Sequence, residues 1–591
     1  MKSENHQQKK AIVSKLATSG INISPDTLEI LMNCEEPLEM LNLIIKETSF
    51  IPSFNSYLTL DILQKISNQK IQKILKRVIS KEVTVNKSAN SDDNKTENSQ
   101  IIIDSNLPFQ NLQISESIED KQKLVQEEPT TLNPIISSSM DMTLPAKKQT
   151  KARAHETAKS SLQFKPIAKD YDFSYEILKD PTGKLYTDGE YEDFYNLTLD
   201  KYNKLKSLMR KRPEMKAATN INNIFRLSRN FEISTIGLVN DIYQSKNDNY
   251  IITLEDTTGT INVLVKNSSD NAENIQIIKR TLKDQMLYVD GIYKPGEQGK
   301  PGIMFANSVS KIDIPANYEP NYSNEPVSMA LISDLHIGSK EFEEKLFKKF
   351  LEFINGKLGH KNYRDIASKI KYIIINGDLV DGIGVYPNQQ EDLEISDIYK
   401  QYSAATELLS RIPDYIKIFY ISGNHEPVRN AIPRPAVPKK YSQELMNMGV
   451  KCLGNPSLIK THGVNSLVYH GESIHDMNLL LHDLDINNPV ETMKEFLICR
   501  HLAPIFGEKT QIAPLDNDWL VIDKIPDVFH TGHIHINGIG KYRNVSLINS
   551  GCFQAQTDFM RSFGITPTPG ITPIIELDTL NLLLLDFKKL D

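Results

Sequence analysis

Residues 328–339 read Ser-Met-Ala-Leu-Ile-Ser-Asp-Leu-His-Ile-Gly-Ser, and the organisation of the chain is best understood outward from them. The apolar run Met329 to Ile332 predicts a strand buried on both faces. The run leads into Asp334 and His336. Because side chains at i and i+2 of an extended chain point the same way, a strand end here can present a carboxylate and an imidazole to one metal ion. Such pairs are common, so this one alone is only a weak indication.

Further polar blocks follow apolar runs downstream, each where a strand is expected to end. They read Gly377-Asp378, Gly423-Asn424-His425-Glu426, Tyr469-His470-Gly471 and Gly532-His533-Ile534-His535. Each block has a plain structural alternative, since His470 could be a satisfied core histidine and Asn424 could hold a turn. Strand ends converge on one crevice in alternating β/α architecture, so these side chains can instead meet. Their succession predicts a centre for two metal ions.

The chain before this stretch divides into segments of different composition. Apolar residues at amphipathic spacing in residues 1–80 predict an N-terminal helical domain, for which protein contacts are the expected role. Residues 81–168 are rich in polar residues and poor in aromatics, which predicts a disordered linker. Residues 169–230 predict a helical connector. The last domain is expected to cover residues 319–591.

Residues 231–318 contain several short alternating runs separated by turn signals such as Asp256-Thr257-Thr258-Gly259. With one short helix expected at 273–282, they suggest a small Greek-key β-barrel of the oligonucleotide-binding (OB) type. Such barrels bind single strands through stacking and basic residues, or they serve as packing modules. The few aromatic residues leave these two roles equally supported. The fold class predicted for the chain is therefore multidomain α+β.

Length, net charge and cysteine content exclude several classes of protein. At 591 residues the chain is too long for one hydrophobic core, and its net charge of -7 does not describe a globally basic nucleic-acid binder. Its four cysteines include no C-x-x-C pair, which argues against a disulfide framework and fits a reducing compartment. The sequence has no long apolar run and its N-terminus is polar, so we expect a cytoplasmic protein without membrane contacts.

The polar blocks resemble those of the calcineurin-like metallophosphoesterase superfamily, whose fold is a β-sandwich flanked by helices. The resemblance implies that Asp334, His336 and His535 hold one metal and that Asn424, His470 and His533 hold the other, with Asp378 bridging the two. It also implies that His425 is a catalytic residue and not a ligand, because the matching residue lies beside the phosphate, where it can stabilise the charge or protonate the leaving oxygen. Oxygen and nitrogen ligands suit manganese, iron, zinc or magnesium. Manganese is the metal that the nuclease members favour, and it is expected here.

Neighbouring segments resemble the small subunit of the archaeal family-D DNA polymerase. The segments that carry this resemblance are 426–436, 498–507, 518–523 and 548–557, and the likeness extends over about residues 171–591. It implies a 3′-to-5′ proofreading exonuclease that pairs with a large polymerising subunit and acts on the 3′ end of single-stranded or mismatched DNA. The linker is a candidate site for other replication factors. At Glu472 and His475 the sequence departs from the family, which normally has Arg and Asp there.

Basic residues lie in a Pro-rich loop directly after His425. Arg429, Arg434, Lys439 and Lys440 are therefore predicted to contact the DNA backbone, although a solvated loop is the alternative. His501 and His530 are assigned structural roles. Two other functions stay open at this point: a non-catalytic scaffold subunit that binds the polymerase and DNA, and a phosphomonoesterase.

Overall fold

The structure is a computed structural model that describes residues 164–297, 301–562 and 564–590, together with short stretches and single positions between Ile12 and Ile71. The chain separates into two compact units, Met1–Gln149 and Thr150–Asp591. In the first unit, helix α3 (Pro37–Thr48) lies in the predicted helical domain. The short parallel strands β1 (Asn22–Ile23) and β2 (Tyr57–Leu58) were not predicted. The linker predicted from residue 81 lies outside the described residues as far as residue 163.

Ordered packing in the second unit begins before the boundary that composition predicted at Ala168. The ring of Phe164 packs against the core of the C-terminal domain. Ala168 belongs to the short 3-10 helix η1 (Ile167–Asp170) and is fully buried. Its carbonyl oxygen accepts a hydrogen bond from Lys371 Nζ at 3.0 Å. These contacts attach the start of the second unit to the C-terminal domain.

A closed five-strand barrel follows, as the alternating runs predicted. Its strand order is β4-β5-β6-β8-β7, and its interior is filled by aliphatic side chains that include Val239, Ile252 and Val263. The register shifts between Asp290 and Gly291 of β7 because β8 carries one extra residue, Asn307, opposite them. A side chain at Gly291 would collide with the carbonyl group of Phe305. The elements are β4 (Phe231–Gln244), β5 (Tyr250–Asp256), β6 (Gly259–Val265), η3 (Ser269–Asn271), α8 (Ala272–Lys279), β7 (Met286–Lys294) and β8 (Ile303–Lys311).

The predicted helical connector is only partly helical. It contains α6 (Tyr191–Met209), η2 (Pro213–Met215) and α7 (Ile221–Ile224). Tyr202, Leu205 and Met209 on one face of α6 pack against the barrel, in a cluster that also includes Val521 of the C-terminal domain. The connector also supplies strand β3 (Tyr175–Lys179), which pairs with a strand of the C-terminal domain. That domain therefore begins before the barrel in sequence, and its predicted start at residue 319 omits this strand.

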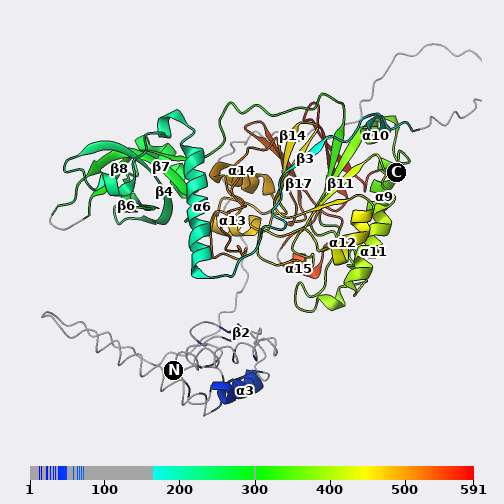
Figure 1. Cartoon of the computed structure of the whole chain (residues 1–591), viewed down its shortest axis with the longest axis horizontal. Coiled ribbons are helices and arrows are strands. Elements are labelled where there is room, and N and C mark those ends of the chain that lie inside the picture. Colours follow the sequence, from blue (N-terminus) through cyan, green and yellow to red (C-terminus); the bar gives the residue numbers. More distant parts are fainter. Residues whose placement is uncertain are drawn as a thin grey trace, which may run out of the picture. The chain divides into compact units, whose positions relative to one another are not determined.

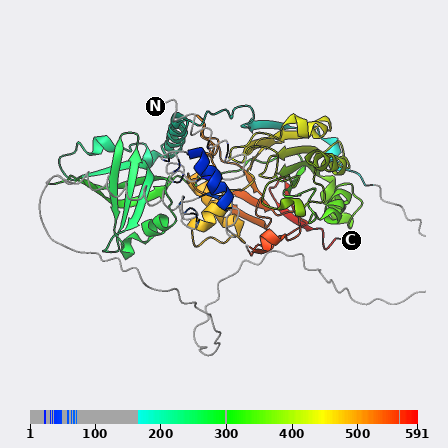
Figure 2. The same ribbon diagram turned by 90° about the horizontal axis from the view of Figure 1, so that it is seen from below.

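Buried charges join the barrel to the C-terminal domain. Glu495 is 2% exposed and pairs with Arg280 at 3.0 Å and with Lys311 at 3.3 Å. Arg280 also pairs with Asp483 at 2.6 Å. Because one carboxylate is shared by two cations from the barrel, the contact fixes the barrel against this part of the domain. Figure 2 shows the barrel strands in green from a second direction.

The C-terminal domain contains two six-stranded sheets. The first has the order β12-β11-β10-β9-β18-β19 and the second the order β16-β17-β15-β14-β13-β3. Strands β9 to β12 are parallel, as are β14, β15 and β17. The strands of the first sheet are β9 (Ser328–Ile332), β10 (Ile370–Asn376), β11 (Lys417–Ile421), β12 (Lys451–Leu453), β18 (Ile571–Glu576) and β19 (Leu582–Asp586). Those of the second, besides β3, are β13 (Ser457–Thr461), β14 (Val464–Val468), β15 (Val528–Thr531), β16 (Asn537–Tyr542) and β17 (Val545–Ser550).

Side-chain alternation along the strands explains the layers. In β9, Met329 and Leu331 enter the core shared by the two sheets, whereas Ala330 and Ile332 face the helices on the other side. Figure 1 shows α9, α11 and α12 on one side of the strands and α13 and α14 on the other. The helices are α9 (Glu344–Ile354), α10 (Lys361–Ser368), η4 (Gln389–Glu391), α11 (Ile398–Leu409), α12 (Lys439–Asn447), α13 (Ile474–Leu480), α14 (Pro489–Cys499) and α15 (Asp558–Ser562). The observed architecture is thus a sandwich of two sheets between helices.

None of the helices within the described part of the chain combines the length and the apolar character needed to cross a bilayer.

Candidate metal centre

All the predicted ligands lie in loops that follow the carboxyl ends of five strands. β9, β10 and β11 are neighbours in the first sheet, and β14 and β15 are neighbours in the second. Asn376 at the end of β10 joins the sheets there, because its side-chain amide donates to the carbonyl oxygens of Tyr469 at 2.9 Å and His530 at 3.1 Å. His470 in turn donates from Nδ1 to the carbonyl oxygen of Asn376 at 2.8 Å. The two sheets therefore bring their polar loops to one place.

The backbone of these loops differs from the extended geometry that the i, i+2 argument assumed. β9 ends at Ile332, and both Asp334 and His336 have a positive φ of 53°. His533 and His535 likewise follow the end of β15 with φ of 69° and 61°. The prediction that an extended backbone points Asp334 and His336 the same way was therefore wrong, although their side chains do meet. Non-glycine residues in the left-handed region are uncommon and concentrate at functional sites, where the surrounding contacts hold them.

The first group of ligand atoms comes from Asp334, His336 and His535. These three atoms all lie within 4.8 Å of one another, and all three residues are buried. His336 Nε2 is 3.1 Å from His535 Nε2, and His535 Nε2 is 3.5 Å from Asp334 Oδ1. Two imidazole nitrogens and a carboxylate oxygen thus surround one point, as three ligands of one cation would.

The second group contains Asp378, His470 and His533, whose ligand atoms also lie within 4.8 Å of one another. His470 Nε2 is 3.2 Å from Asp378 Oδ2 and 3.1 Å from Asn424 Oδ1. The structure therefore brings Asn424 to this group, as the sequence predicted. The same Oδ2 of Asp378 is 3.8 Å from His336 Nε2 in the first group. Asp378 consequently lies between the two groups, in the position of a bridging ligand.

Two of the four predicted ligand histidines, His533 and His535, are held in the neutral form that coordinates a divalent cation. Burial lowers the pKa of His533 and of His535 well below the ordinary range, so both imidazoles are neutral and able to coordinate. The Nδ1 atoms of both rings are buried without a hydrogen-bond partner among the described residues. Burial, with a contribution from the charge of Asp378, raises the pKa of Asp334 to about 6. The buried carboxylates favour a cation between them, and the donor set of oxygen and imidazole nitrogen fits two divalent metals.

Asp381 orients one ligand, and the sequence reasoning missed it. Its Oδ1 is 3.0 Å from His336 Nδ1, so His336 donates there and keeps Nε2 directed at the metal group. The other oxygen accepts a hydrogen bond from Gln389 at 2.9 Å. The sequence does contain an indication of this role. Asp381 is a second carboxylate three residues after Asp378, in Gly377-Asp378-Leu379-Val380-Asp381.

Glu426 joins the loops after β10 and β11, a role that the sequence did not assign to it. Its carboxylate accepts hydrogen bonds from the backbone nitrogens of Asp378 at 3.1 Å, Leu379 at 2.8 Å and Gly423 at 2.6 Å. Tyr420 donates to the same group at 2.6 Å. Burial and the nearby charge of Asp378 raise the pKa of Glu426 to about 7. Glu426 therefore fixes the loops that carry the predicted bridging carboxylate and amide.

His425 belongs to neither of the predicted ligand sets, but with His336 and Asp381 it forms a third group whose ligand atoms lie within 4.8 Å of one another. Its Nδ1 donates to the carbonyl oxygen of Asp381 at 2.7 Å, which assigns the Nδ1 proton and leaves Nε2 available. Its ring stands edge-on to that of His336, with centroids 4.5 Å apart. Its side chain is 14% exposed, so a molecule at the mouth of the site can reach it. This position is compatible with a proton donor or a phosphate contact.

The basic residues that were predicted to contact DNA separate into two kinds. Lys439 and Lys440 begin α12 and are exposed. Arg429 is half-buried and donates to the carbonyl oxygens of Pro433 and Leu185. Arg434 is 3% exposed, forms an ion pair with Glu472, and is thereby removed from the surface. The structure gives Arg434 a structural position, so we do not retain it as a DNA contact.

Glu472 supports the loop that carries His470. Besides Arg434, it binds the side chain of Asn455 at 2.9 Å, and Asn455 Oδ1 accepts a hydrogen bond from the backbone nitrogen of His470 at 3.1 Å. Glu472 is thus held in a buried ion pair with Arg434. His475 is half-buried, with its ring 5.4 Å from that of His533.

Replacing Glu472 by Ala is expected to destabilise the C-terminal domain by about 3–5 kcal/mol, because the buried guanidinium of Arg434 would lose its counter-charge. Thermal unfolding of the purified variant measures this effect. Glu176→Ala is a suitable control, since Glu176 is exposed and pairs with Lys460 only at 3.8 Å. Equal stability of the two variants would contradict the structural role assigned to Glu472.

The two histidines that were assigned structural roles lie outside these groups. His501 Nε2 is 2.9 Å from Asp518 Oδ2, and both side chains are buried. His530 Nε2 is 3.0 Å from the hydroxyl of Ser550. Neither histidine belongs to a candidate metal-binding group among the described residues.

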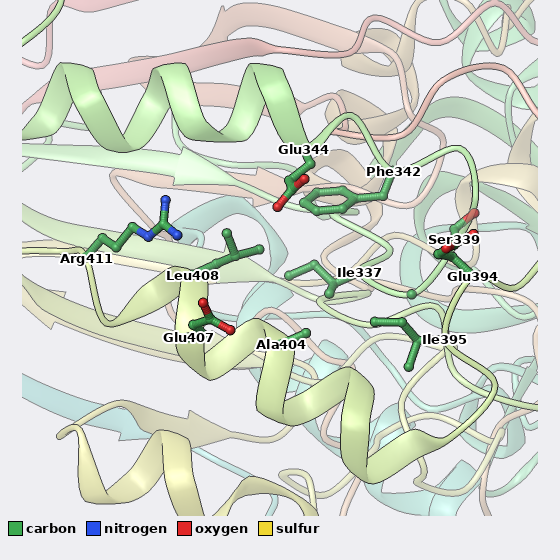
Figure 3. Close-up of a pocket in the computed structure, with 11 residues that line it drawn as sticks. Ile337, Ser339, Phe342, Glu344, Glu394, Ile395, Ala404, Glu407, Leu408 and Arg411 are labelled. Carbon is green, nitrogen blue, oxygen red and sulfur yellow. The ribbon is translucent and has the colours of Figure 1, made fainter.

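A cavity of about 230 Å³ lies near the metal centre but is distinct from it. Figure 3 shows apolar side chains such as Phe342, Ile337 and Leu408 around it, with Glu407 and Arg411 from the end of α11 and beyond. It contacts the loop that carries His336 only through the residues that follow, and none of the predicted ligands lines it. The chemistry described above therefore belongs to the ligand cluster and not to this cavity.

Two sheets between helices, with carboxylate, amide and imidazole side chains converging from their strand ends, are typical of a domain of the metallophosphoesterase type. Residues 327–537 match the family model of the calcineurin-like phosphoesterases, and this range contains every predicted metal ligand. The class expected from the sequence motifs is thereby confirmed.

Similarity to curated proteins extends well beyond that range. The DNA polymerase II small subunit of Methanothermobacter thermautotrophicus is 40% identical over 420 residues, which cover 71% of this chain and 84% of that protein. The small subunits from Methanocaldococcus jannaschii and Pyrococcus horikoshii are each 38% identical, and the matches cover 70% and 73% of this chain and 69% of each relative. The chain belongs to the family of DNA polymerase II small subunits.

Proposed function

We propose that this chain is a 3′-to-5′ exonuclease that removes nucleotides from primer ends as part of a two-subunit DNA polymerase in the cytoplasm. The observation that carries the proposal is the complete set of ligands: Asp334, His336, Asp378, Asn424, His470, His533 and His535 lie together in two adjoining groups. A scaffold subunit would have no need to keep buried carboxylates and neutral imidazoles at strained backbone positions. We therefore favour catalysis over the purely structural alternative.

The proposed chemistry is hydrolysis of a phosphodiester. Two divalent cations, for which manganese is the proposed identity, would lower the pKa of a water and stabilise the entering and leaving oxygens of an in-line displacement. The proton donor or phosphate contact would be a side chain of the protein. His425 presents Nε2 toward the site while Nδ1 donates to the carbonyl oxygen of Asp381. When protonated, His425 can donate a proton to the leaving 3′ oxygen or stabilise charge on the phosphate.

The neighbouring domains fit a DNA substrate and a partner subunit. The closed barrel, with the order β4-β5-β6-β8-β7 and α8 between β6 and β7, supports the proposed OB type. Barrels of that type bind single strands or pack against other proteins. The exposed Lys439 and Lys440 are proposed to contact the DNA backbone. Because the curated relatives are named as small subunits, we propose that a large catalytic subunit binds this chain. Other replication factors are proposed to contact the linker.

The test is digestion of an oligonucleotide carrying a 5′ label by the purified full-length chain, with and without Mn²⁺. We expect a ladder of labelled products that shorten one nucleotide at a time from the 3′ end, and only when metal is present. Immediate release of a labelled mononucleotide would reverse the proposed polarity. If the oligonucleotide stays intact while a small phosphate monoester is hydrolysed, the site is a phosphomonoesterase instead.

A further inference from the structure

A short loop beside the metal centre exposes aliphatic side chains to solvent. We call residues Gly382-Ile383-Gly384-Val385-Tyr386, which follow Asp381, the apolar loop. Ile383 is 49% exposed and Val385 is 36% exposed. Leaving two β-branched aliphatic residues in water at one spot is unfavourable unless they meet a ligand or partner, although single exposed apolar residues are common. To infer which ligand or partner covers these side chains, we consider how the loop is held and which residues lie next to it.

Two buried glutamines hold the apolar loop in one conformation. The side chain of Gln401 accepts from the backbone nitrogen of Gly382 at 2.9 Å and donates to its carbonyl oxygen at 3.1 Å. Gln389 accepts from the backbone nitrogen of Val385 at 2.9 Å and donates to the carbonyl oxygen of Asp381 at 2.8 Å. Both glutamines are at most 2% exposed. The loop is thus held at both ends by buried amides, and its aliphatic tips stay outside.

The apolar loop adjoins His425. A side chain at Gly382 would collide with the carbonyl oxygen of His425, so the two backbones are in close contact. The ring of Tyr386 lies 6.4 Å from the ring of His425, which in turn lies 4.5 Å from the ring of ligand His336. The hydroxyl of Tyr386 donates to Asp392 at 3.0 Å, which fixes the ring. A phosphate bound at the metal centre would therefore have this loop as a direct neighbour.

We propose that the apolar loop contacts the nucleobases that flank the scissile phosphate. This inference rests on the proposed nuclease function, and it specifies which part of the protein binds the bases of the substrate. A nucleobase has an apolar face and is joined through one sugar to its phosphate, so it fits an apolar surface beside a phosphate site. The aliphatic tips carry no hydrogen-bonding groups. The contact is consequently independent of base identity, as the editing of any primer end requires.

The experiment compares two oligonucleotides on the Mn²⁺-loaded full-length chain. One has normal nucleotides throughout, and in the other the last two 3′ nucleotides are abasic. Wild-type protein is expected to digest the normal end roughly tenfold faster than the abasic end, because the apolar contact between the bases and the loop is lost when the bases are absent. For the Ile383→Ser/Val385→Ser variant, this ratio is expected to fall to about twofold or less because the variant has already lost that contact.

The matched control is Leu584→Ser. Leu584 is 44% exposed on the edge strand β19, two strands from β9, and its variant should keep the wild-type ratio. A base-to-abasic ratio that is the same in the loop variant as in wild type would overturn the inference while leaving the nuclease function intact. No digestion of either oligonucleotide by wild-type protein would instead remove the proposed function, and the inference with it. Melting temperatures of all variants verify that they are folded.

Discussion

His425→Ala is expected to lower the rate of 3′-end digestion by about 10²–10⁴-fold, the usual contribution of a positioned general acid or base. The variant should nevertheless keep the metal-dependent rise in melting temperature, because the substitution leaves every residue of the two predicted ligand sets in place. Its backbone nitrogen donates to Asp378 Oδ1 at 2.9 Å, and the substitution retains this hydrogen bond. The measurement is a time course of single-stranded oligonucleotide digestion at saturating Mn²⁺.

A matched substitution makes this result specific. His482 is exposed in the turn after α13, so His482→Ala alters the same residue type away from the site. We expect digestion by His482→Ala to remain within about twofold of wild type, as is usual for surface substitutions. Full activity of His425→Ala would contradict the role proposed for His425 and would assign the proton transfer to another group.

Asp378→Asn is expected to abolish both digestion and stabilisation by metal. Asp378 lies between the two groups of ligands, and Asn keeps its shape while it removes the charge that two cations share. At a Mn²⁺ concentration 100 times the dissociation constant, binding stabilises the folded state by about 2.7 kcal/mol per site. That corresponds to a rise in melting temperature of about 5–10 °C per occupied site in the wild type, and to little or none in the variant.

The control for this prediction is Asp365→Asn, at an exposed position on α10. This variant should show the full metal-dependent rise in melting temperature. Without metal, Asp378→Asn should be less stable than wild type at neutral pH, because the nearby histidines, chiefly His470, together outweigh burial and hold the pKa of Asp378 well below its usual range, so that the ionised carboxylate stabilises the folded state. A metal-dependent rise as large in Asp378→Asn as in wild type would mean that the cations bind elsewhere.

Much of the fold and the ligand set was predictable because strands and polar ends follow simple rules. β9, β10 and β11 are short and apolar, and each is followed by a chemistry-bearing residue such as Asp334, Asp378 or Asn424. Parallel strands place these ends together. The barrel was predictable from alternation, because each of its strands has one face in a common interior.

Local backbone conformation was not predictable in the same way. Asp334 and His336 can be brought to one ion either by an extended backbone or by residues in the left-handed region. The structure shows that both residues adopt the left-handed conformation. Strand β3 was missed because its pairing partner, β13, is separated from it by the whole barrel in sequence. Such a non-local pair depends on packing that a short window of sequence does not contain.

Burial of polar side chains was the other source of error. Arg434 lies in the loop directly after His425, which suggested a DNA contact. Its guanidinium is instead buried against Glu472. Conversely, Asp381 and Gln401 were not singled out from the sequence, yet Asp381 accepts a hydrogen bond from His336 and Gln401 accepts one from the backbone of Gly382. Their roles depend on hydrogen bonds between segments that are distant in sequence, and residue type alone does not determine such partners.

The most direct test of the central claim is an anomalous difference map at the manganese absorption edge from crystals grown with Mn²⁺. We expect two peaks per chain, about 3.5–4 Å apart as in other two-metal sites. One should be surrounded by Asp334, His336 and His535, the other by Asn424, His470 and His533, and Asp378 should contact both. Absence of both peaks, or a single peak away from Asp378, would contradict the account.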